Sequence, residues 1–169
     1  MLLFFLQYIL IFLGKLVIFE NMAIIVKSIE YFLFNIGGYF DGCNEIRILG
    51  DLFETSKSKE DYINILPDPN CELSPILKKE LITILNEIYL VKWDRKYYNN
   101  EICDGTQWEL EIRYNNRKTS KISFGSNEYP KLTKEKGETL VESSESYSKE
   151  FKKLLKILNK IADQKNFFQ

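Results

Sequence analysis

The chain has 169 residues and a mass of 20.0 kDa, which is long enough for one domain with a substantial core and hardly for two. Its 45% hydrophobic and 14% aromatic content indicates a folded protein, because disordered chains contain far fewer apolar residues. The net charge of -1 does not indicate a nucleic-acid-binding protein, which normally carries a basic surplus on one face.

The chain contains no histidine, so Ser-His-Asp and Cys-His catalysis and His-ligated zinc are excluded within it. Acid–base chemistry would fall to carboxylates, Lys or Tyr, which need larger pKa shifts to work near pH 7. Cys43, Cys71 and Cys103 lack the close pairing of zinc ligands and are expected to be ordinary thiols in a reducing compartment. We therefore expect neither a metal nor a cofactor.

The N-terminal residues 1–21 form an apolar segment, MLLFFLQYILIFLGKLVIF followed by Glu20 and Asn21. The run is about the length that spans a bilayer, roughly 20 residues, although Lys15 interrupts it. Three interpretations stay open: a membrane anchor through residues 2–19, an extension upstream of a true start at Met22, or a packed helix of the domain. If it is an anchor, Lys15 and Lys27 on its C-terminal side favour a cytoplasmic location for the rest of the chain.

Residues 28–66 alternate with a period of two and predict an antiparallel meander. SIEYFLFNI, residues 28–36, has apolar residues at both phases, which predicts a strand buried on both faces. NEIRIL, residues 44–49, predicts a half-buried strand with Glu45 and Arg47 facing water. DLFETS and EDYINIL, residues 51–56 and 60–66, predict a further pair of strands.

The next segments predict a helix and a β-hairpin. Ser74 followed by Pro75 is typical of a helix start, and apolar residues at spacings of three and four continue the helix to about residue 91. In the hairpin over 108–124, Trp108, Leu110, Ile112 and Tyr114 form one apolar face, which Ile122 and Phe124 are expected to continue after an Asn115-Asn116 turn. The helix is the expected lid on that face.

The polar stretch at about 131–147 is interpreted as a mobile linker before a last amphipathic helix over 151–161. The lysines around that helix are more typical of a solvated face than of a nucleic-acid or lipid site. The fold class predicted for residues 22–169 is a single α+β domain, with an antiparallel sheet of about five or six strands packed by two amphipathic helices.

The second half of the chain resembles a family of small uncharacterised bacterial α+β domains, a domain of unknown function. The resemblance rests on Trp93-Asp94, on DGTQWELEIRY from Asp104 to Tyr114, and on GSNEYP from Gly125 to Pro130. It covers about residues 26–163 and implies a fold without implying an activity. Such domains usually pass from the Tyr-Pro step directly into the last helix, whereas here residues 131–145 intervene.

The candidate ligand- or partner-binding residues are the polar and aromatic members of this pattern: Trp93, Asp104, Trp108, Asn127 and Tyr129. Together they would make an aromatic cradle with a carboxylate and an amide. Each also has a structural explanation, either as a residue that stabilises a turn or as a large side chain buried in the core. Glu109 and Glu111 are expected on the wet face of the hairpin, where they could pair with Lys118 or Lys121.

We expect a non-enzymatic protein- or ligand-binding module of the inhibitor, immunity or accessory type, with another protein as its partner and no nucleic acid. One alternative is a membrane-anchored accessory protein, which depends on residues 2–19. The second alternative is a small histidine-free enzyme that uses carboxylate and tyrosine chemistry. The sequence predicts no catalytic residue and leaves the oligomeric state open.

Overall fold

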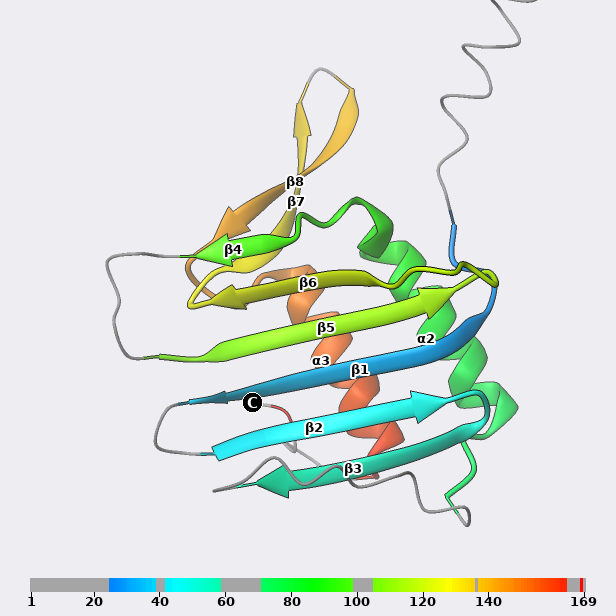
Figure 1. Ribbon diagram of the computed structural model, residues 1–169. Coiled ribbons are helices and arrows are strands. Elements are labelled where there is room, and N and C mark those ends of the chain that lie inside the picture. The colour runs from blue at the N-terminus through cyan, green and yellow to red at the C-terminus, as the bar shows by residue number, and fades with distance from the viewer. Residues whose placement is uncertain are drawn as a thin grey trace, which may run out of the picture.

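Six strands form one sheet in the order β3-β2-β1-β5-β6-β4 (Figure 1). A computed structural model describes residues 25–38, 42–58, 71–98, 105–135, 137–163 and 168. The strands are β1 (Ile29–Gly38), β2 (Gly42–Leu49), β3 (Leu52–Ser58), β4 (Lys96–Tyr98), β5 (Gln107–Tyr114) and β6 (Lys121–Ser126). All neighbours are antiparallel except β4, which runs parallel to β6. The N-terminal apolar run, the strand predicted over 60–66 and Asp104 lie outside the described residues.

Two helices cover one face of this sheet, so the predicted α+β fold is confirmed (Figure 1). They are α2 (Pro75–Glu87), followed by the short 3-10 helix η1 (Leu90–Lys92), and α3 (Lys149–Ile161). The Ser74 hydroxyl accepts a hydrogen bond from the Leu77 amide at 3.3 Å, and Ser148 caps α3 in the same way. The α-helix ends before residue 91 because Tyr89 adopts a left-handed conformation, with φ 53°. Within the described ranges, no helix is long and apolar enough to cross a membrane.

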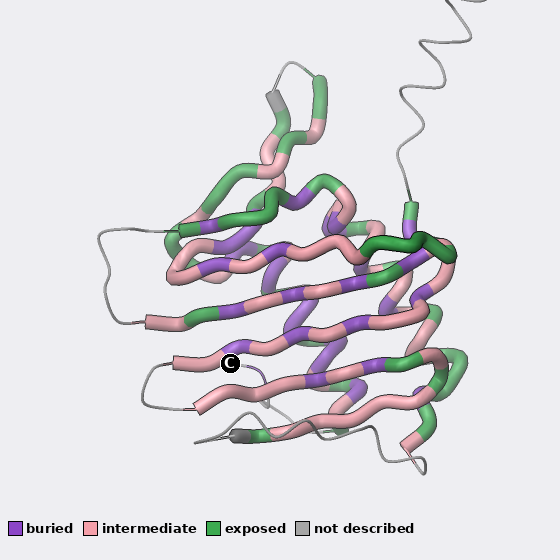
Figure 2. Tube along the Cα trace, in the orientation of Figure 1, coloured by how far each residue is buried: buried purple, intermediate pink, exposed green. Residues whose placement is uncertain are grey.

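The core lies between the helices and the inner face of the sheet. Buried and half-buried residues alternate along the central strands (Figure 2), as in β1, where Phe32, Phe34 and Ile36 point inward. The prediction that β1 is buried on both faces is wrong. Tyr31, Leu33 and Asn35 are only half-buried, because both helices lie on the other side of the sheet.

The predicted hairpin forms, but the apolar side chains of its return strand point to the opposite face of the sheet from the one expected. Phe124 lies opposite Glu109 and Ile122 opposite Glu111, so both apolar side chains belong to the outer face. The connection runs from Asn115 to Ser120, and its length sets a register that places Lys121 opposite the inward residue Ile112. Lys121 instead donates a hydrogen bond to the Trp93 carbonyl at 2.6 Å, so it does not pair with Glu109 or Glu111.

The region interpreted as a mobile linker contains a second β-hairpin, which corrects that prediction. Its strands are β7 (Tyr129–Glu135) and β8 (Glu138–Ser144), and they pair along their whole length. Gly137 takes the positive φ of 88° that the tight turn requires. The base of the hairpin is fixed to α3, because the Ser148 hydroxyl donates a hydrogen bond to the Pro130 carbonyl. The polar composition therefore reflects a solvated ribbon rather than an unstructured connection.

Candidate functional site

The aromatic residues of the predicted site converge, and they do so around Phe151 of α3. The Phe151 ring centroid lies 6.5 Å from Trp93, 5.2 Å from Trp108 and 4.7 Å from Tyr129. Trp93 and Trp108 also meet edge to face at 6.0 Å. These side chains are only 2% to 3% exposed, so their rings form part of the core rather than an accessible cradle.

The polar groups of these aromatic side chains interact with other groups of the protein. The indole N–H of Trp93 donates to the Ile88 carbonyl at 2.9 Å, and that of Trp108 donates to the Glu128 carbonyl at 2.8 Å. Burial is the main factor that raises the pKa of Tyr129 to about 12, with a smaller contribution from Tyr147. A phenol with so high a pKa stays protonated at neutral pH and is a poor general base.

Asn127 links the two ends of the β5–β6 hairpin. It adopts a left-handed conformation, with φ 57°, where the chain turns from β6 into β7. Its side-chain oxygen accepts a hydrogen bond from the backbone N–H of Thr106 at 2.9 Å, and the backbone N–H of Asn127 donates to the Thr106 carbonyl at 3.0 Å. Asn127 therefore has a structural role, next to the aromatic cluster.

Two glycines of the pattern make this arrangement possible. A Cβ at Gly105 would lie 2.0 Å from the side-chain oxygen of Asn127, and a Cβ at Gly125 would lie 2.5 Å from the indole nitrogen of Trp108. The pattern that suggested a binding site thus encodes a close-packed corner of the fold. Asp104 lies outside the described residues, so its predicted role stays a prediction.

The outer face of the six-stranded sheet is a second candidate, which we call the open face. We define it by the outward residues of the central rows, which no described element covers (Figure 1). They are Tyr31, Leu33, Asn35, Glu45, Arg47, Glu109, Glu111, Ile122 and Phe124, with Lys96 and Tyr98 at the β4 edge. Apart from Lys96 and Tyr98 they are half-buried, since neighbours on the same face shield one another.

The middle of the open face has a local excess of negative charge. Glu45 pairs with Arg47 at 2.9 Å, but within the described ranges no hydrogen bond or ion pair reaches the carboxylates of Glu109 and Glu111. The pKa of Tyr31 reports this environment. Burial raises it most, Glu111 raises it further, and Arg47 lowers it.

The β6 and β4 side of the open face is aromatic. Tyr98, which is 47% exposed, packs edge to face on Phe124 with ring centroids 5.8 Å apart. The Lys96 ammonium lies 5.9 Å from the centre of the Phe124 ring. The open face thus combines acidic side chains at its centre with an exposed aromatic edge.

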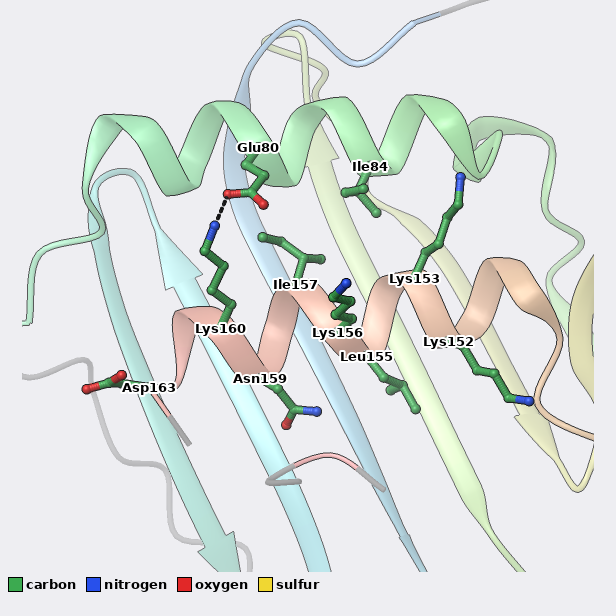
Figure 3. Close-up of a pocket in the computed structure, with 10 residues that line it drawn as sticks. All are labelled: Glu80, Ile84, Lys152, Lys153, Leu155, Lys156, Ile157, Asn159, Lys160 and Asp163. Carbon is green, nitrogen blue, oxygen red and sulfur yellow. Dashed lines mark hydrogen bonds and ion pairs between the residues drawn. The ribbon is translucent and has the colours of Figure 1, made fainter. Parts of the chain in front are cut away.

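A groove of about 940 Å³ between α2 and α3 is the third candidate (Figure 3). Ile84, Leu155 and Ile157 contribute its apolar part, and lysines of α3 form its rim. Lys160 pairs with Glu80 at 2.5 Å, and Lys153, which also lines the groove, pairs with Glu87 at 2.8 Å. These exposed pairs link the two helices and neutralise two of the four lysines that line the groove, and we rank the groove below the open face.

The described residues contain no group of three or more Cys, Asp or Glu side chains that could hold a metal ion. Comparison of the chain with protein-family models, with curated proteins and with solved structures finds no match. The resemblance to a family of bacterial domains therefore stays a prediction.

Proposed function

We propose that this protein is a non-enzymatic binding module, of the inhibitor, immunity or accessory type, whose open face binds another protein. The partner is expected to present Lys or Arg side chains beside an apolar or aromatic residue. The basic side chains would meet Glu109 and Glu111, and the apolar residue would pack against Phe124 and Tyr98.

The observation that carries this proposal is the state of Glu109 and Glu111. Both are half-buried on a sheet that has no described cover, and neither carboxylate has an ion-pair partner within the described residues. Shielding a carboxylate from water without a partner is unfavourable, so an incoming cation gains more here than at a fully exposed site. Complementary charge also steers association and selects the partner.

Binding is better supported than catalysis by the same residues. The chain has no histidine, and the carboxylates stand on the surface of a sheet rather than in an enclosed pocket. Glu109 and Glu111 are two residues apart on one strand with no described base or nucleophile placed to act with them.

The test uses NMR of the full chain titrated with short peptides that combine Lys or Arg with Trp. We expect amide shifts to concentrate on β1, β5 and β6 at their open-face positions, and to weaken with salt because the contact is partly electrostatic. Glu109→Gln/Glu111→Gln should weaken binding by about tenfold, from roughly 1 kcal/mol or less for each charge pair.

The matched control is Glu138→Gln/Glu142→Gln on β8, which removes the same charge from the far hairpin. An equal loss of affinity in both variants would mean that the net charge of the protein, and not the open face, governs binding. Shifts that map to the α2–α3 groove would also refute the proposal. A native partner captured from host lysate must show the same dependence on Glu109 and Glu111.

A further inference from the structure

The open face carries three columns of outward side chains, one on each of the neighbouring strands β1, β5 and β6 (Figure 1). The middle column, on β5, holds the carboxylates of Glu109 and Glu111. Four side chains flank these carboxylates on the same face, and three of them are apolar. They are Leu33 and Asn35 on β1, with Ile122 and Phe124 on β6. A charged column therefore lies between two columns that are mostly apolar.

The width of these three columns fits an α-helix. Neighbouring strands are about 4.8 Å apart, so the three columns together span roughly 10 Å. An α-helix with its side chains is about 10–12 Å across, and an amphipathic one presents a stripe more than about 100° wide. An extended segment presents only every second side chain to a surface, in a single row. A helix can therefore contact all three columns at once, whereas a single strand can contact only one.

The spacing of the two carboxylates also fits a helix. Glu109 and Glu111 are two residues apart on β5, which corresponds to about 6.6–6.8 Å. Residues four apart on a helix lie on the same side, about 6 Å from each other along the axis. Positions i+1 and i+3 then project about 80° to either side of the line between i and i+4, toward the flanking columns. A strand with basic residues at i and i+2 has a similar spacing, so the width of the surface is what favours the helix.

The charges of the middle column indicate which side chains such a helix would carry. Arg113 follows Glu111 by two residues at the exposed end of β5, and no ion pair within the described residues joins the two. On the far side of β1, Arg47 pairs with Glu45 at 2.9 Å and does not bond to Glu111. Two basic residues and one acidic residue therefore complement the column. An acidic residue one turn before the basic ones is the order that stabilises an isolated helix.

We propose that the partner binds the open face with an amphipathic α-helix that lies along β5. Its basic residues at i and i+4 contact Glu111 and Glu109, and an acidic residue at i-4 faces Arg113. Apolar residues at i+1 and i+3 pack against the columns of β1 and β6. The helix shields the carboxylates from water, which strengthens their charge-assisted hydrogen bonds. This inference rests on the proposed function, since it names the kind of segment that the same surface binds.

The experiment compares two peptides of identical composition, each of about 16 residues of Ala, Leu, Lys and Glu, which is long enough for an isolated helix. The first has Glu at i-4, Lys at i and i+4, and Leu at i+1 and i+3. In the second, the same residues are permuted so that Lys stands at i and i+2 of an alternating pattern. We expect the first peptide to bind the full chain about three- to fivefold more tightly, because the second misplaces one charge pair. Transferred NOEs should show that the bound peptide is helical.

Double-mutant cycles test whether the helix lies along β5. Lys at i should couple to Glu111→Gln and Lys at i+4 to Glu109→Gln, each by roughly twofold or more, and the crossed combinations should couple more weakly. Glu142→Gln on β8 is the matched control and should couple to neither lysine. Equal coupling of each lysine to both glutamates would overturn the proposed alignment.

The two peptides also separate this inference from the proposed function. If the second peptide shifts open-face amides and binds as tightly as the first, or more tightly in an extended conformation, the helix is refuted while the binding surface stands. If neither peptide shifts the amides of the open face, both the helix and the proposed function are refuted.

Discussion

Asn127 gives the sharpest test of whether the patterned corner serves folding or binding. Its side-chain oxygen accepts the Thr106 amide at 2.9 Å, and its backbone has φ 57°. Asn127→Gly keeps the backbone conformation and removes the hydrogen bond, which should cost about 1–2 kcal/mol of unfolding free energy. Asn127→Ala adds the left-handed penalty of about 1 kcal/mol, for a total of about 2–3 kcal/mol.

Asn116 is the matched control for this pair of changes. It has nearly the same backbone conformation, with φ 55°, but it is exposed and its side chain has no hydrogen bond within the described ranges. Subtracting Asn116→Gly from Asn127→Gly removes the effect of glycine on the unfolded chain and leaves the hydrogen bond. Urea denaturation followed by circular dichroism provides the free energies.

The outcome distinguishes two roles for Asn127. If Asn127→Gly is no more destabilising than Asn116→Gly, the Thr106 hydrogen bond contributes little to stability. Asn127 would then not hold the corner together, and it would again be a candidate for contact with a ligand. A difference of about 1–2 kcal/mol would support the structural role.

Three further predictions concern the same core. Phe151→Ala should cost about 3–5 kcal/mol in urea unfolding, because the ring is fully buried among aromatic neighbours, and a loss below 1 kcal/mol would contradict this packing. Gly125→Ala should cost about 1–3 kcal/mol and shift the Trp fluorescence, since the new methyl group would meet the Trp108 indole. Burial raises the pKa of Tyr97 to about 12, so its contribution to stability is complete below pH 10 and is lost as the pH rises toward 12. Tyr97→Phe should reduce the loss of unfolding free energy between pH 10 and 12, measured by urea denaturation. An unchanged dependence on pH would mean that Tyr97 does not make this contribution.

The pattern of neighbouring residues predicted those helices and strands whose formation depends on residues close together in the chain. The Ser74-Pro75 helix start, the alternation of β2 and β5, and the amphipathic last helix all appear in the structure. In these segments the side chain that faces the core is set by the period of the element itself.

Features that depend on a distant partner were missed. The outward facing of Ile122 and Phe124 follows from the register between β5 and β6, and a shift of one residue reverses every side chain of a strand. β4 is a strand only because its three residues pair in parallel with β6. The open face could not be assembled from sequence, since β1 and β5 are neighbours in space but not along the chain.

The aromatic members of the candidate site lie together in the structure, but what surrounds them was not predicted. Trp93, Trp108 and Tyr129 do meet, yet the residue that fills the space between them, Phe151, comes from the last helix. The position of an apolar residue on one side of a helix does not indicate which strand it will contact. Because Phe151 fills the space between the three rings, they form a packed core and not the expected binding site.

The sheet order has a consequence for how the protein folds during its synthesis. The central strand β1 can complete its pairing only after β5 has left the ribosome, and Phe34 meets Phe151 and Phe168 only when the C-terminal part is made. The meander of β1, β2 and β3 therefore emerges with its apolar face uncovered. Contacts between sequence-distant residues slow folding, so the apolar face of the meander stays open to aggregation until the C-terminal part has been made.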